Sequence, residues 1–200
     1  MATKYGFSDI REQLVHSLKG AYPTKWEEYQ AASILGEDIF GSPKPHPNAV
    51  LNLFLQQNVR FAIPLAAYRA TVGGFSSLIN EEPGSILPRL TLASTVYGME
   101  VVHGGVAELA NTMVINMMEG DCLDKKCASE QGAKELDGLC DVVIKGLRSS
   151  GMFSSLPLGD IVCVACAKTV EQVHGSWCEA VWENLPRIFM VGKSWEEILV

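Results

Sequence analysis

Apolar side chains recur through most of the chain every three to four residues, the spacing that gathers them on one face of an α-helix. The longest such run extends from about Thr91 to Met118, where Val96, Met99 and Val106 repeat the pattern. Shorter runs predict further helices over residues 8–20, 25–35, 48–57, 61–70, 128–147, 166–184 and 195–199. The sequence has no alternating strand patterns bounded by hairpin turns. We therefore predict an all-α fold, an irregular multi-helix bundle.

Prolines and small polar residues mark where these helices begin and end. Ser8, Thr24, Asn48 and Ser194 stand at or just before the starts of predicted helices, where a side-chain oxygen can accept a hydrogen bond from a backbone N–H. The last long helix is expected to end before Pro186, because proline lacks an N–H and clashes with the preceding turn.

Three prolines within residues 43–47 interrupt the helical pattern and predict an extended connector. We place a domain boundary there. It separates an N-terminal helical pair, residues 1–40, from a helical domain, residues 48–200.

Composition narrows the class of protein. Apolar residues make up 48% of the 200 positions and charged residues 20%, which is typical of a folded domain. The net charge of −7, without a basic stripe, disfavours nucleic-acid binding. Apolar runs fall short of the ~20 residues that a membrane span needs, and the N-terminus lacks the apolar stretch of a signal peptide. We expect a soluble intracellular protein of the cytoplasm or nucleus, with other proteins as partners.

Cysteine spacing carries the sharpest chemical prediction. Cys122 and Cys127 lie in a polar turn, and Cys163 and Cys166 are separated by two residues, as in a zinc knuckle. His174 would lie about 12 Å along a helix from Cys166, too far to share its ion. We predict a zinc ion bound by Cys122, Cys127, Cys163 and Cys166 that staples the C-terminal half. Unligated core cysteines, other ligand sets and disulfides are the alternatives.

Four thiolates leave no open position for water, so such a zinc is structural. Cys140 and Cys178 lie on predicted helical faces and are expected in the core. The histidines fit surface or satisfied core positions, and we assign no catalytic or cofactor-binding residue.

Aromatic residues near the C-terminus are expected to clamp the last long helix: Trp177, Trp182, Phe189 and Trp195.

The order of these features resembles the region that follows the BTB/POZ domain in proteins of mushroom-forming fungi. The resemblance is carried by residues 2–11, 23–36, 63–69 and 97–100, the two cysteine pairs, residues 181–189, and Ser194 with Trp195. Members of that family carry a BTB domain before this region, and BTB domains dimerise and recruit partners. The resemblance implies that Cys122, Cys127, Cys163 and Cys166 match the paired cysteines of the family.

Two functions compete on these grounds. The first is a non-catalytic helical protein-interaction module, an adaptor or scaffold with a structural zinc. The alternative is a small-molecule-binding protein or enzyme, in which an apolar pocket is lined by methionines of the long helix: Met99, Met113, Met117 and Met118. Methionine at helical spacing more often fills a core, which favours the first.

Overall fold

A computed structural model describes residues 8–35, 45–79, 84–119, 140–141, 143–147, 151–156 and 162–199. These residues form helices joined by turns, and no β-strand occurs among them. The all-α prediction is therefore confirmed for the described part of the chain. None of the helices found in these ranges is both long enough and apolar enough to cross a bilayer.

The first two helices are close to their predicted bounds. Helix α1 spans Ser8–Ala21 and α2 spans Trp26–Leu35. Between them, the ring of Tyr22 is buried and packs edge-on against Phe54 of the next helix, with ring centroids 4.8 Å apart. The turn between α1 and α2 is therefore anchored on the rest of the molecule.

Three helices and a 3₁₀ turn follow: α3 (Pro47–Gln56), η2 (Arg60–Ala62), α4 (Ile63–Thr71) and the short α5 (Phe75–Leu78). The cap of α3 differs from the prediction. His46 is the N-cap, and its Nδ1 accepts from the backbone N–H of Asn48. Asn48 itself is buried, and its amide donates to the carbonyls of Ser77 and Leu78. Asn48 is therefore not the cap of α3, because its side chain bonds to backbone carbonyls about 30 residues away.

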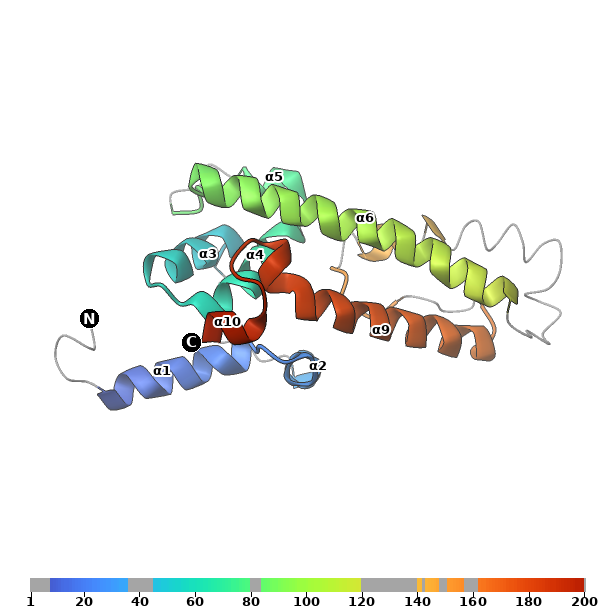
Figure 1. The fold of residues 1–200 in the computed structure, drawn as a ribbon, viewed down its shortest axis with the longest axis horizontal. Helices are drawn as coiled ribbons and strands as arrows, with labels where there is room; N and C mark the ends of the chain where they lie inside the picture. Colours follow the sequence, from blue (N-terminus) through green and yellow to red (C-terminus); the bar gives the residue numbers. More distant parts are fainter. Residues whose placement is uncertain are drawn as a thin grey trace.

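The two longest helices lie side by side. Helix α6 spans Arg89–Glu119 and α9 spans Val164–Ile188, and they run in opposite directions (Figure 1). Two glycines of α6 lie against aromatic rings of α9 and of its C-cap residue. A Cβ on Gly98 would overlap the Phe189 ring, and one on Gly105 would lie 3.1 Å from Trp177. The absence of side chains at these glycines lets the two helices pack closely.

Helix α9 passes through Pro186 instead of ending before it. Proline has no N–H to give to the carbonyl of Trp182, four residues earlier. The indole N–H of Trp195 donates to that carbonyl instead, at 2.9 Å. The predicted stop is wrong because a side chain from outside the helix satisfies the group that proline leaves unpaired.

The end of α9 is closed by a turn with a residue in the left-handed region. Met190 has φ of 57°, while Val191 N–H donates to Pro186 O and Met190 N–H to Arg187 O. This is the Schellman arrangement, in which glycine usually holds the left-handed position. Helix α10 (Trp195–Leu199) follows, and Ser194 Oγ accepts from Glu197 N–H as the predicted cap.

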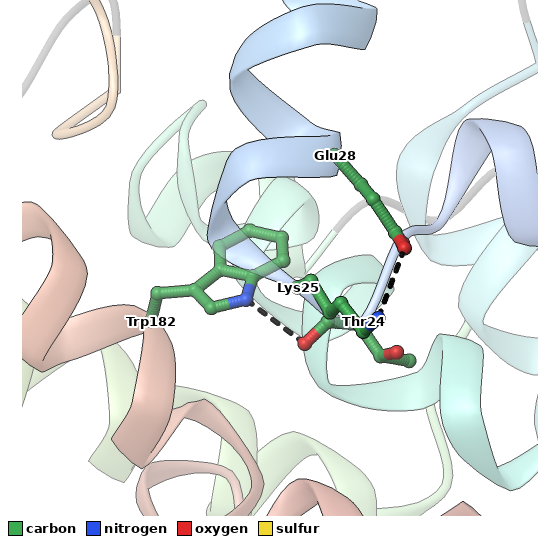
Figure 2. A network of polar contacts seen from close by, with 4 residues as sticks. All are labelled: Thr24, Lys25, Glu28 and Trp182. Carbon is green, nitrogen blue, oxygen red and sulfur yellow. Dashed lines mark hydrogen bonds and ion pairs between the residues drawn. The ribbon is translucent and has the colours of Figure 1, made fainter.

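Contacts join the N-terminal helical pair to the later helices. The indole N–H of Trp182 in α9 donates to Thr24 O at 3.1 Å (Figure 2). The guanidinium of Arg69 in α4 donates to Ala21 O and lies over the ring of Tyr22. The predicted boundary at residues 40–48 falls mostly on residues outside the described ranges, and the two-domain division stays a prediction.

Candidate functional site

The predicted zinc knuckle lies at the start of α9. Cys163 is the N-cap residue, and Cys166 is buried in the first turn. The N-terminus of a helix carries a partial positive charge, which favours thiolates over thiols. The start of α9 therefore brings Cys163 and Cys166 close together, with Cys166 in the hydrophobic core.

The other predicted pair, Cys122 and Cys127, lies outside the described residues. Within the described ranges, no three side chains of His, Cys, Asp or Glu gather around one point. Cys163 and Cys166 lie within these ranges, and both of their predicted partners lie outside them. The four-cysteine zinc site therefore stays a prediction.

The remaining cysteines pack between helices, as predicted. Cys178 is buried in α9. The thiol of Cys140 is half-buried and donates to Ala110 O of α6 at 3.7 Å. Both side chains contribute to the interior beside the α6–α9 pair.

A polar cluster inside the protein joins α9 to the segment 151–156. His174 Nε2 lies 2.9 Å from Met152 O and 3.2 Å from Cys178 Sγ. The thiol of Cys178 donates to the same carbonyl at 3.4 Å. His174 and Cys178 are one helical turn apart, so α9 places both beside one backbone carbonyl. The sequence gives the spacing of the two side chains but no sign that Met152 meets them.

Burial sets the protonation states in this cluster. It lowers the pKa of His174 below its usual value, although the hydrogen bond to Met152 O opposes this shift. It raises the pKa of Cys178 to about 12. A cysteine nucleophile needs a thiolate, and these shifts favour the neutral thiol and neutral imidazole. The arrangement therefore acts as a hydrogen-bonded link between α9 and the segment 151–156.

Tyr68 of α4 completes the attachment of that segment. Burial raises the pKa of its phenol, and backbone hydrogen bonds from Phe153 and Met152 oppose the shift. Gly151 has φ of 92°, and a Cβ there would lie 2.8 Å from the phenol oxygen. Only a residue without a side chain fits this turn against Tyr68.

An aromatic cluster surrounds the same region. Trp182 stacks on Trp195, with ring centroids 5.6 Å apart, which confirms that aromatic residues clamp the end of α9. The cluster also includes rings from α2, α4 and the segment 151–156: Trp26, Tyr29, Tyr68 and Phe153. Phe153 and Tyr29 show no recognisable motif in the sequence, because their neighbours are far away along the chain.

Methionines of α6 fill the core. Met99 and Met113 are both buried in the main hydrophobic cluster. The side chains of Met117 and Met118 lie outside the described part. Met99 and Met113 thus have the packing role that methionine at helical spacing often has.

Large apolar side chains are exposed on three consecutive parts of the chain: α5, the segment 84–88 and the first half of α6. Leu90 is 85% exposed and Ile86 65% exposed. The others in this stretch are Phe75, Ile79, Tyr97 and Val101. Helix α5 contacts α6, so these residues occupy neighbouring elements. We call this set the α5–α6 apolar surface, and it is a candidate binding site.

Comparison of the chain with models of protein families, with curated proteins and with solved structures found no significant match.

Proposed function

We propose that the protein is a helical protein-interaction module, an adaptor or scaffold, of the kind that follows the BTB domain in proteins of mushroom-forming fungi. The α5–α6 apolar surface carries this proposal. Exposed apolar side chains scattered singly are common, but a set on neighbouring elements indicates a surface that another protein covers. The interior supports the same function, because His174 and Cys178 are engaged in structural hydrogen bonds.

We include a structural zinc in the proposal, bound by Cys122, Cys127, Cys163 and Cys166. Its support is the spacing of Cys163 and Cys166, which the start of α9 holds close together. Zinc held by four thiolates would join residues 120–139 to α9. It would supply folding free energy and no reactive water.

Affinity capture tests the interaction function. The full chain and its Ile86→Glu variant are immobilised and exposed to an extract of a mushroom-forming fungus, and the captured proteins are quantified by mass spectrometry. Because Ile86 is 65% exposed, the charge should weaken partner binding several-fold without unfolding the protein. Leu14→Glu, on α1 and 58% exposed, is the matched control and should capture the same proteins as the wild type. Equal capture by all three would contradict the proposal.

A further inference from the structure

The outward face of α6 repeats with the spacing of a coiled coil. Exposed positions alternate every four and three residues from one end of the helix to the other, and only Ser94 among them is half-buried. We call this face the α6 seam: Leu90, Ser94, Tyr97, Val101, Gly104, Glu108, Asn111 and Ile115. Heptad spacing of this kind keeps one stripe of side chains facing a second helix over several turns.

The seam lies on the side of α6 that faces away from the core. The buried side chains of this helix include Met99, Val102, Val106, Leu109 and Met113. At 100° per residue, they centre roughly 140° around the helix from the seam. Figure 1 shows α4 and α9 on one side of α6 and α5 beside its first half. Seven of the eight seam residues are exposed, so a partner helix can reach them.

The chemistry of the seam is unusual for a face that only meets water. Leu90, Tyr97, Val101 and Ile115 are between 40% and 85% exposed. Glu108 is the single charged residue in the seam. Solvent-facing helix positions normally carry charged and polar side chains, so the four exposed apolar side chains among these eight positions point to an occupant that covers them.

A second copy of the chain, running antiparallel, matches the seam position by position. One register sets Leu90 opposite Ile115, Tyr97 opposite Glu108, Gly104 opposite Val101 and Asn111 opposite Ser94. Leu90 then meets Ile115, the Tyr97 hydroxyl can donate to the Glu108 carboxylate, and Val101 faces the space left by Gly104. Each pair occurs twice, because a twofold axis makes the interface self-complementary.

Other alignments of two copies lose this match. A parallel in-register pair sets Glu108 against Glu108, which is unfavourable. An antiparallel pair shifted by one heptad sets Leu90 against Glu108 and leaves Ile115 without an apolar partner. The composition of the seam therefore selects both a direction and a register.

We propose that the protein forms a homodimer through antiparallel pairing of the α6 seam, with Tyr97 facing Glu108 of the second copy. This inference rests on the proposed function, because it names a second copy as the partner for one part of the α5–α6 apolar surface. Residues of that surface outside the seam, such as Phe75 and Ile86, remain for another protein.

Sedimentation equilibrium of the full chain and three Tyr97 variants tests the pairing. The wild type should be a dimer at micromolar concentration. Tyr97→Glu places like charges opposite each other twice per dimer and should raise the dissociation constant by about 100-fold or more. Tyr97→Lys faces Glu108 with the opposite charge and should remain dimeric. Tyr97→Glu combined with Glu108→Arg should restore the dimer.

Leu53→Glu, at a 46% exposed position of α3, is the matched control and should leave the dimer unchanged. Circular dichroism checks that every variant keeps its helices. A wild type that stays monomeric at all concentrations would overturn the inference. So would a dimer that Tyr97→Glu leaves intact, or a charge-swapped double variant that stays monomeric. Ile86 lies outside the α6 seam, so the capture of partner proteins by the Ile86→Glu variant does not depend on the dimer. The proposed function and this inference can therefore fail separately.

Discussion

At the scale of single residues, two glycines in the long helices differ in what a methyl group would meet. Gly98→Ala places a Cβ against the buried Phe189 ring, so we expect the free energy of unfolding to fall by about 1–3 kcal/mol. Gly175→Ala meets nothing within 4 Å and should stabilise the protein by roughly 0.5–1 kcal/mol, because alanine favours helix. Denaturant unfolding measures both. Equal effects would mean that α6 and α9 do not pack through Gly98.

The buried imidazole of His174 makes stability depend on pH. Its pKa is lowered in the folded protein, so the unfolded chain binds the proton more tightly. This contribution is fully present above the unfolded pKa of about 6.5 and is lost as pH falls through the folded value. We expect the free energy of unfolding to be lower at pH 5.5 than at pH 8. His174→Gln can still donate to Met152 O and should show a weaker pH dependence, whereas an unchanged dependence would place the titrating group elsewhere.

At the scale of elements, Trp195 of α10 and Pro186 of α9 are coupled through the carbonyl of Trp182. Trp195→Phe removes the donor and leaves a buried carbonyl unpaired, which costs about 1–3 kcal/mol in addition to lost packing. In a Pro186→Ala background, the new N–H can bond that carbonyl, so the penalty of Trp195→Phe should shrink by about 1 kcal/mol. A double-mutant cycle in denaturant measures this coupling. Additive penalties would show that the two residues act independently.

The spacing of apolar residues along the sequence predicts some helix ends and misses others. The bounds of α6 lie within two residues of those predicted from apolar spacing, and α2 begins two residues after Thr24, which marks its start in the sequence. The cap of α3 does not follow from spacing, because the Asn48 side chain bonds to carbonyls about 30 residues away. The end of α9 does not follow either, because the Trp195 indole bonds to the carbonyl that Pro186 leaves unpaired. The α6 seam also escapes prediction, since α6 is apolar on several sides and spacing alone does not show which side the core covers.

At the scale of the whole molecule, the cluster around α9 joins distant parts of the chain. Met152 O meets His174, Trp182 meets Thr24, and Tyr29 packs against Phe153. Sequence spacing relates residues within one helix, such as His174 and Cys178, but not residues brought together by packing. For the predicted zinc site, the start of α9 places one cysteine pair, and the second pair stays a prediction.

Zinc content, measured by elemental analysis of the purified full chain, tests the four-cysteine site most directly. We predict about one zinc per chain. Cys163→Ser should lose the metal, and with it stability, because binding free energy at such a site is folding free energy. Cys140→Ser and Cys178→Ser should keep the metal and destabilise the protein far less. A wild-type protein without bound zinc, or a Cys163→Ser variant that retains it, would contradict the site.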